Sequence, residues 1–262
     1  MKNNTTFVTC YYKIKSKQSA SVYLNWIDNM LTILNVPIIL YTNIETSLLL
    51  TAYASKIKIV IIEICDFYSN KYHNGFELSY EQDIKRKHLH SVDLFKIYNE
   101  KANFLKLAID DNYFNTSFFY WIDIGCFRPE VTHLNYPDLH NWPNFNKLSR
   151  DKINMFSVNE ININDRILDL NMMTNDTLRT QGNAKIVGGF FGGRVDKILL
   201  YISEYYYLLE QWNLHEKFIG IDNYIMTNIF LKLEDECNLL SKDSTHMNHI
   251  TDTHMWFQNY LM

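Results

Sequence analysis

The sequence has few cysteines and no long hydrophobic segment, and each shortage excludes a class of protein. Its four cysteines are widely scattered and form no CxxC pair or zinc-knuckle pattern, so we expect neither a disulfide framework nor a structural zinc site. The amino-terminal residues lack the apolar core of a signal peptide. The longest apolar runs are far shorter than the roughly 20 residues that span a bilayer. These features predict a cytoplasmic protein without a transmembrane segment, in solution or at a membrane surface.

The sequence also lacks an excess of positive charge. Its net charge is −4 at pH 7 and its isoelectric point is near 6.1, so it has no general electrostatic footprint for nucleic acid, and we expect no nucleic-acid partner. Hydrophobic residues make up 47% of the chain and charged residues 21%. This balance predicts a folded globular protein rather than a disordered one.

The first part of the chain alternates strands with helices. Apolar runs and helical spacing predict, in order, a strand at 6–12, a helix from Ser19 or Ser21 to Leu34, a strand at 38–42, a short helix within 43–55 and a strand at 57–64. This order is typical of a parallel sheet with right-handed crossovers. We therefore predict an α/β fold of Rossmann type, with a mostly parallel central sheet flanked by helices.

The most informative stretch runs from Ser91 to Arg128. Helical periodicity predicts a helix from Ser91, with Lys101 beside an apolar stripe formed by Leu94, Tyr98, Ala102, Leu105 and Ile109. An aromatic and apolar run at 117–122 predicts a central strand that is buried on both faces. It ends at Asp123, and an acid at the carboxyl end of such a strand is where open α/β sheets place ligands. The alternative is that Asp123 is an ordinary turn residue.

Glycine is scarce, yet four of the eight glycines lie within the six residues 188–193. This density indicates either a close approach of the backbone to a ligand or a glycine-weakened buried strand without one. The surrounding residues predict a strand at 154–158, helices at 195–212 and 221–233, and polar or extended loops at 129–143 and 159–182. Asp222, near the start of the last helix, is either a cap or a functional acid.

Two clusters of charged or metal-ligating side chains have both an ordinary and a functional interpretation. The basic run Lys85–His88 is either a solvated face or a contact for an anionic group. Three late histidines lie near two acids and are either exposed residues of a polar segment or ligands of a divalent metal; the group comprises His246, His249, His254, Asp243 and Asp252.

The chemistry of these residues favours transfer of a glycosyl group. An acid can hold a divalent metal against a diphosphate, and Lys and Arg can neutralise the charge that develops on a phosphate leaving group. The combination suits a nucleotide-sugar donor and a glycan or other hydroxyl acceptor. One alternative is a binding module without turnover, built on an aromatic platform of Trp121, Trp142, Phe190 and Phe191. A nucleotidyltransferase is less favoured, because the basic loop after the first strand contains no glycine.

Seven segments also resemble, in the same order, the HtrL/YibB-like proteins, which are similar to glycosyltransferases of the GT-A fold. The segments are TFVTCYYKI, YLNWIDNML, PIILYT, YNEKANFLKLAI, FFYWIDIGCFR, GGFFGG and GIDNY. The resemblance covers roughly residues 6–225, and YNEK and WIDIG are its most specific parts. It implies a single GT-A-like domain over 1–262, with a nucleotide-binding half at 1–128 and an acceptor-binding half at 129–262. It further implies a UDP-sugar donor, dependence on Mn²⁺ or Mg²⁺, and a role in building surface glycans.

The resemblance also implies a donor site. Asp123 takes the place of the acid motif that contacts metal and ribose, and Lys101 faces the donor phosphates. Thr9 and Tyr11, at the end of the first strand, lie near the base. The remaining residues expected at the donor are Trp121, Gly125 and Arg128.

Other positions follow from the same resemblance. Gly188 and Gly189 line the sugar and acceptor pocket, Asp222 contacts the acceptor as catalytic base or orients the substrate, and His254 completes the metal site with Asp123. One departure matters, because Gly125 stands where GT-A enzymes commonly carry a second acid. A single carboxylate supplies too few of the oxygen ligands that Mg²⁺ or Mn²⁺ takes, so another group must assist Asp123.

Overall fold

The fold is built on a sheet in which most neighbouring strands are parallel. The computed structural model describes residues 4–15, 18–84, 86–128, 142–158, 161, 185–242, 245 and 256–262. Within these ranges a seven-stranded sheet has the order β3-β2-β1-β4-β6-β5-β7. Its strands are β1 (Thr5–Cys10), β2 (Ile38–Thr42), β3 (Lys58–Ile61), β4 (Phe118–Ile122), β5 (Ile153–Ser157), β6 (Phe190–Arg194) and β7 (Cys237–Ser241). The predicted α/β class and mostly parallel sheet are confirmed.

The strand pairing creates a reversal in the middle of the sheet. β1 pairs in parallel with β2 on one side and with β4 on the other, so that Phe7 lies opposite both Ile38 and Tyr120. The chain first moves outward from β1 to β2 and β3, and then returns to add β4 on the opposite side of β1. β6 runs antiparallel to both β4 and β5. The carboxyl ends of β1 and β4 therefore flank a topological switch point.

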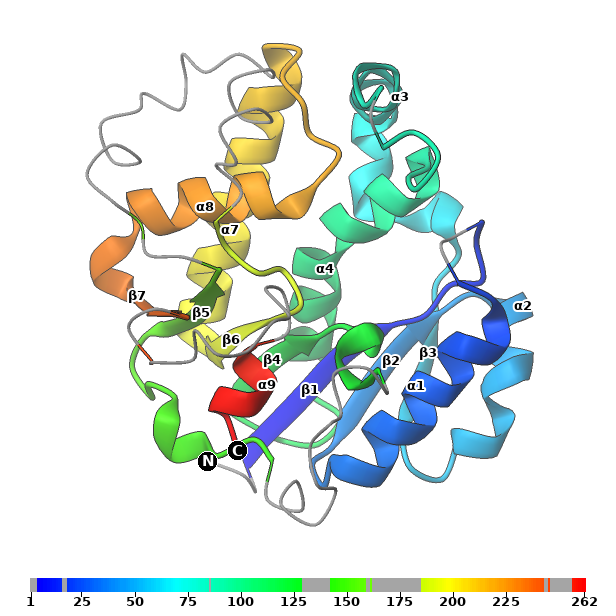
Figure 1. Cartoon of the computed structure of the whole chain (residues 1–262), viewed down its shortest axis with the longest axis vertical. Coiled ribbons are helices and arrows are strands. Elements are labelled where there is room, and N and C mark those ends of the chain that lie inside the picture. The colour runs from blue at the N-terminus through cyan, green and yellow to red at the C-terminus, as the bar shows by residue number, and fades with distance from the viewer. Residues whose placement is uncertain are drawn as a thin grey trace.

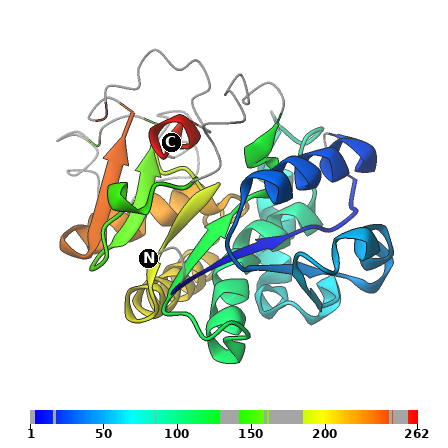
Figure 2. The same cartoon turned by 90° about the horizontal axis from the view of Figure 1, so that it is seen from below.

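Helices cover both faces of the sheet (Figure 1). The helices α1 (Ala20–Ile33) and α9 (Phe257–Tyr260) lie on one face, and α4 (Val92–Asp111), α7 (Val195–Leu214) and α8 (Asp222–Lys232) lie on the other. Figure 2 shows these layers edge-on, with α1 in blue and α9 in red on one side and α7 in yellow on the other. Alternate residues of β4 enter the two cores, since Tyr120 lies in the core on the side of α1 and Trp121 stacks with Phe104 of α4 on the other. The predicted burial of this strand on both faces is confirmed.

Shorter elements connect these layers. They are the helices α2 (Ile44–Ser47) and α3 (His73–Gln82) and the 3₁₀ turns η2 (Leu48–Tyr53), η3 (Ile64–Asp66), η4 (Tyr68–Tyr72), η5 (Ile124–Phe127), η7 (Phe145–Lys147) and η8 (Glu234–Glu236). The helix predicted within 43–55 is thus divided into α2 and η2, and the strand predicted at 57–64 ends early because η3 begins at Ile64. Among the described helices, none combines the length and the apolarity of a membrane span.

The buried face of α4 differs from the predicted stripe. Phe95, Phe104 and Ala108 are fully buried, whereas Leu94 and Ile109 are only half-buried. The helix packs on the sheet along one side and contacts α3 and α7 along others, so its apolar surface is wider than one stripe. A 3.6-residue pattern cannot show how many neighbours a helix has.

Several predicted features lie outside the described residues. They are the loop at 129–141, most of the loop at 159–182, Lys85 of the basic run, and the cluster of His246, His249, His254, Asp243 and Asp252. The metal role expected for His254 therefore stays a prediction.

Gly192 provides a test of how tightly β6 packs on β4. A Cβ atom at this position would lie 2.4 Å from the Phe119 carbonyl oxygen and 2.5 Å from the Tyr120 Cα. Both contacts are with backbone, so the strands would have to separate. We expect Gly192→Ala to lower the free energy of unfolding by about 2–3 kcal/mol in urea denaturation, which is the upper part of the usual range for overpacking.

Gly125→Ala is the matched control, because its added Cβ would meet side-chain atoms alone, the Trp26 ring at 3.4 Å and Arg128 Nε at 3.7 Å, which are ordinary contacts. This variant should change the free energy of unfolding by less than about 1 kcal/mol. Equal losses in the two variants would contradict the close β4–β6 approach.

Candidate functional site

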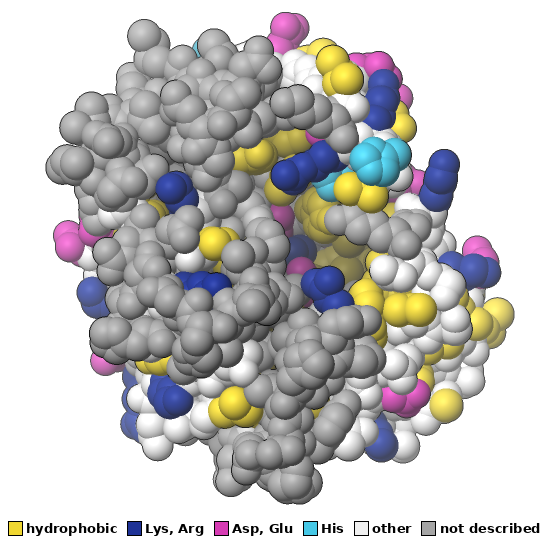
Figure 3. All heavy atoms as spheres, in the orientation of Figure 1, with side chains coloured by type: hydrophobic (Ala, Val, Ile, Leu, Met, Phe, Trp, Pro, Cys, Tyr) yellow, Lys and Arg dark blue, Asp and Glu magenta, His cyan; other side chains and the backbone are white. Residues whose placement is uncertain are grey.

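A cavity of about 260 Å³ opens at the carboxyl ends of β1 and β4. Its walls come from the residues after these two strands, from α1 and from the first half of α4; they include Tyr11, Tyr12, Tyr23, Trp26, Leu94, Tyr98, Lys101, Asp123, Gly125 and Arg128. The space-filling view shows a hollow with a hydrophobic wall and with acidic and basic side chains inside it (Figure 3). Chain segments leave β1 and β4 in different directions at the switch point, which is where such sheets leave room for ligands.

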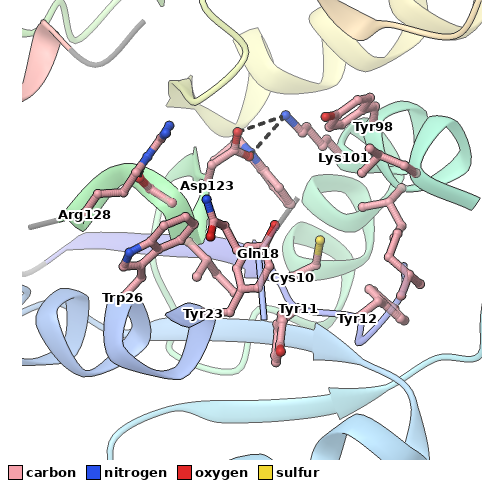
Figure 4. Close-up of a pocket in the computed structure, with 16 residues that line it drawn as sticks. Cys10, Tyr11, Tyr12, Gln18, Tyr23, Trp26, Tyr98, Lys101, Asp123 and Arg128 are labelled. Carbon is pink, nitrogen blue, oxygen red and sulfur yellow. Dashed lines mark hydrogen bonds and ion pairs between the residues drawn. The ribbon is translucent and has the colours of Figure 1, made fainter. Parts of the chain in front are cut away.

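The Lys101 side chain joins three segments that are distant in the sequence. Its Nζ lies 3.1 Å from Asp123 Oδ1 and 2.9 Å from Asp222 Oδ2, and it donates a hydrogen bond of 3.0 Å to the Gly188 carbonyl oxygen. We call these four residues the Lys101 ion-pair group. Its members come from α4, the end of β4, the turn before β6 and the start of α8. Figure 4 shows the contact between Lys101 and Asp123.

Asp123 is held from two further directions. The Trp121 indole Nε1 donates to its Oδ1 at 2.6 Å, and its own backbone N–H donates to the Gly189 carbonyl oxygen at 2.8 Å. Trp121 reaches the carboxylate because residues two apart at a strand end point to the same side. About 32% of the Asp123 side chain remains exposed, so this fixed carboxylate still faces the cavity.

The two residues before Lys101 anchor neighbouring segments. Asn99 donates from Nδ2 to the Ile219 carbonyl oxygen at 3.0 Å, which fixes the chain shortly before α8. Glu100 accepts from two backbone N–H groups of η4, at 3.0 Å and 2.9 Å. The YNEK motif thus positions both the acid-bearing start of α8 and the loop before α3, in addition to presenting Lys101.

Burial and charge act in opposite directions on the ionisable groups of this site. Burial lowers the pKa of Lys101, but Asp123 and Asp222 together raise it further, so that the net shift is upward and the ammonium stays charged. Burial raises the pKa of Asp222, and Lys101 offsets part of that rise. Asp222 Oδ2 is close to Nζ, but their angles are not those of a hydrogen bond. The attraction there is purely that of an ion pair.

The structure brings most of the predicted donor residues together. Tyr11, Lys101, Trp121, Asp123, Gly125 and Arg128 all line the cavity. Thr9 does not line it. This residue is fully buried and precedes Tyr11 by two positions, so that its side chain lies on the same face of the sheet but deeper in the fold. Thr9 therefore has no direct contact with the cavity, and its expected position near a bound base stays a prediction.

The predicted acceptor residues occupy a different place. Gly188 and Gly189 are absent from the cavity wall, and their carbonyl oxygens instead accept bonds from Lys101 and from the Asp123 backbone. Asp222 is only 5% exposed and lies behind Lys101. It is not a cap, since Ile221 holds the N-cap position of α8 and no side chain caps that end. The acceptor roles of these residues stay predictions.

The position of Gly125 explains the missing second acid. The strand ends at Ile122 and the chain enters η5, so a side chain at 125 does not point the same way as Asp123. A Cβ atom there would face the Trp26 ring and the Arg128 side chain. The second acid near Asp123 is Asp222, which the fold supplies from α8.

Of the two residues expected to bind Mn²⁺ or Mg²⁺, the described one, Asp123, offers such an ion a single carboxylate that is already paired with Lys101. The ammonium lies between the two carboxylates and already neutralises one of their charges. In the part of the chain that the structure describes, no three His, Cys, Asp or Glu side chains gather around a common point. Divalent ions of this kind prefer more oxygen ligands than one free carboxylate offers.

The aromatic residues of the cavity wall are only partly the predicted ones. Trp121, Trp142, Phe190 and Phe191 are at most 1% exposed, so the prediction of an aromatic binding platform formed by them is wrong. Of these four only Trp121 borders the cavity, and it is joined there by Tyr11, Tyr23 and Trp26, with the rings of Tyr11 and Tyr23 5.5 Å apart. Tyr23 and Trp26 lie within the helix predicted to end at Leu34, but helical spacing does not show that this part of α1 borders an opening.

Comparison of the chain with protein-family models and with curated proteins gives no match. We therefore infer a function from the geometry of the site and from the sequence motifs.

Removal of the buried ammonium tests the ion-pair group. We expect Lys101→Met to lower the free energy of unfolding by about 3–5 kcal/mol at neutral pH, because two carboxylates lose their shared cation in a mostly buried position. The matched control is Lys106→Met, on the same helix, where an exposed pair with Asp110 is lost and about 0–1 kcal/mol is expected. Urea denaturation measures both.

The same variant should show a changed dependence on pH. Loss of the ammonium raises the pKa of Asp222 beyond the upward shift that burial already gives it. The folded variant then binds protons more tightly than the unfolded chain, so its stability falls as the pH rises above the ordinary range of aspartate. The deficit relative to the unsubstituted protein should shrink toward acidic pH; a constant deficit would contradict the assigned cause.

Proposed function

We propose that the protein is a glycosyltransferase that moves a sugar from a nucleotide-sugar, first of all a UDP-sugar, to a hydroxyl group of a glycan or another acceptor. The observation that carries the proposal is the cavity at the switch point, into which Asp123 and Arg128 both project. A GT-A-like fold, a relationship to the HtrL/YibB-like proteins and action in the cytoplasm or at its membrane surface belong to the same proposal. They rest on the motifs of the sequence.

Arg128 is the best-placed group for the donor diphosphate. Its Nε donates to the Gly125 carbonyl oxygen at 2.9 Å, and its guanidinium lies 5.4 Å from the centre of the Trp26 ring. These contacts fix the side chain and leave its terminal N–H groups without an ion pair among the described residues. A fixed guanidinium is well suited to two parallel bonds with phosphate oxygens.

Lys101 has a different role in the proposal. Its ammonium forms ion pairs with Asp123 and Asp222 and donates a hydrogen bond to the Gly188 carbonyl oxygen. Figure 4 shows Lys101 and Arg128 on opposite sides of Asp123. We therefore revise the expectation that Lys101 contacts the phosphates and assign it the positioning of the two acids.

The aromatic end of the cavity suits a nucleobase. Tyr11 and Tyr23 lie with their ring centres 5.5 Å apart, and Trp26 lies 5.0 Å from Tyr23. Such rings supply apolar contact and stacking surface to a planar heterocycle. A nucleotide-sugar with its base at Tyr11 and its diphosphate at Arg128 would bring its ribose and the sugar to be transferred toward Asp123.

Asp222 is the proposed general base. It would accept the proton of the acceptor hydroxyl while that oxygen bonds to the anomeric carbon, and the bond from that carbon to the diphosphate breaks. The leaving diphosphate keeps the electron pair, and Arg128 offsets its charge. Because Asp222 is 5% exposed, this role requires a rearrangement that lets the acceptor reach it. In a retaining reaction Asp222 would orient the substrate instead.

A nucleotide- or glycan-binding module without turnover is the second candidate. One observation favours it, since Lys101 neutralises Asp123 and separates it from Asp222. Such a module would use the cavity, with Arg128 and the tyrosines, but would not need a free acid. Turnover distinguishes the two candidates.

Asp123 is the first residue to change. We expect Asp123→Ala and the isosteric Asp123→Asn to abolish hydrolysis and transfer from a panel of UDP- and GDP-sugars, because the fixed carboxylate at the cavity is lost. The matched control is Asp110→Ala, which removes an exposed acid at the end of the same helix that carries Lys101. Circular dichroism checks the fold. Normal turnover in Asp123→Asn would refute the site; UDP binding without turnover in the unsubstituted protein would establish the binding module.

Arg128 tests the orientation of the donor. We expect Arg128→Gln to weaken UDP binding by about 10- to 100-fold in calorimetry, which corresponds to the loss of charge-assisted hydrogen bonds. Uridine, which lacks the diphosphate, should bind equally to both forms. Arg150→Gln, at an exposed arginine, is the control. An equal loss for uridine and UDP would place the diphosphate elsewhere.

A further inference from the structure

We infer that the Lys101 ammonium takes the structural place of a divalent cation, so that the site binds its nucleoside diphosphate as the metal-free anion. The part of this inference that concerns the donor rests on the proposed function. The part that concerns the ion-pair group rests on its geometry alone.

The atoms around Lys101 Nζ are those that a hard cation prefers. Four oxygens surround it: both carboxylate oxygens of Asp123 at 3.1 and 3.4 Å, Asp222 Oδ2 at 2.9 Å and the Gly188 carbonyl oxygen at 3.0 Å. Carboxylate and carbonyl oxygens are also the ligands of Mg²⁺ and Ca²⁺, which bind them at about 2.0–2.6 Å. The observed distances are those of N–H···O contacts, so the same set of ligands is spaced for an ammonium.

The remaining sides of the ammonium are closed by aromatic rings. The centres of the Tyr98 and Trp121 rings lie 5.4 and 5.5 Å from Nζ, within the range in which a ring attracts a cation. The Lys101 side chain is 7% exposed. Water and dissolved ions therefore have little access to the point at which the two acids meet.

The turn before β6 is shaped for this close arrangement. A Cβ atom on Gly188 would lie 2.8 Å from Asp222 Oδ2 and 2.6 Å from Asn223 Oδ1. Glycine therefore lets the backbone carbonyl reach Lys101 while Asp222 keeps its place beside it. This use of Gly188 requires no bound sugar.

The charges of the group explain why a metal ion would gain little beside Lys101. Two carboxylates and one ammonium leave one net negative charge, and Asp123 Oδ1 already accepts from both Lys101 and the Trp121 indole. A divalent ion on the exposed side of Asp123 would have that single carboxylate as its protein ligand among the described residues and would lie near a fixed positive charge. The Lys101 ammonium thus orients the two acids, and Arg128 neutralises the diphosphate.

The first experiment measures Mn²⁺ binding by electron paramagnetic resonance, with no nucleotide present. We expect the unsubstituted protein to bind Mn²⁺ no better than Asp123→Asn does. Lys101→Met, which uncovers two carboxylates and a carbonyl oxygen, should bind it at least about tenfold more tightly and gain thermal stability from it. Lys106→Met should behave as the unsubstituted protein, and Lys101→Met/Asp222→Asn should lose the gain.

Two results would overturn the inference. One is Mn²⁺ binding by the unsubstituted protein that disappears in Asp123→Asn, and the other is a folded Lys101→Met that gains no affinity for Mn²⁺. If Lys101→Met does not fold even with Mn²⁺, the comparison of the unsubstituted protein with Asp123→Asn decides the question alone.

The second experiment measures UDP binding by calorimetry in EDTA and in excess Mn²⁺. Equal affinities, within about threefold, support recognition of the metal-free anion, whereas binding that is tenfold or more tighter with Mn²⁺ overturns it. If UDP fails to bind under both conditions, the proposed function and the donor part of the inference fail together. The Mn²⁺ titration of the first experiment then still tests the ion-pair group.

Discussion

The site depends on the buried ammonium of Lys101, which is stable only while it keeps its oxygen partners. A charge taken out of water is tolerated only where opposite charges and hydrogen-bond acceptors surround it. Lys101 therefore requires that the end of β4, the turn before β6 and the start of α8 meet at one point. The bond that Asn99 donates to the Ile219 carbonyl oxygen fixes the start of α8 against the helix, and the bond that Glu100 accepts from η4 fixes a fourth segment beside it. The acids are oriented because the lysine is fixed.

The parts of this arrangement that the sequence predicts are those with a local signal. A run of apolar and aromatic residues is sufficient to identify β4, and its burial on both faces follows from the lack of polar residues in it. The acid directly after such a strand points to the ligand-binding edge of the sheet. Asp123 was found in this way, whereas Tyr11 and Arg128 were assigned by the family resemblance, and all three line the cavity.

The parts that the sequence did not predict depend on contacts between distant segments. Nothing near Lys101 in the chain indicates that Asp222 is its partner. The family pattern led us to look for a second acid at 125, where the chain has already left the strand and entered η5. Which residues of β1 and the segment after it reach the cavity, as Tyr11 does and Thr9 does not, likewise depends on the segments around them. Residues 237–241 carried too weak an apolar pattern to be recognised as β7.

The antiparallel direction of β6 has a consequence for how the site is maintained. Parallel strands deliver their ends to the ligand-binding edge, whereas β6 delivers its beginning, so the carbonyl oxygens of Gly188 and Gly189 arrive there beside Asp123. A slip of β6 by one residue along β4 would move them by about 3.4 Å and turn each side chain to the opposite face. The hydrogen-bonding register of two central strands thereby sets whether a lysine on a separate helix keeps its full set of oxygen partners.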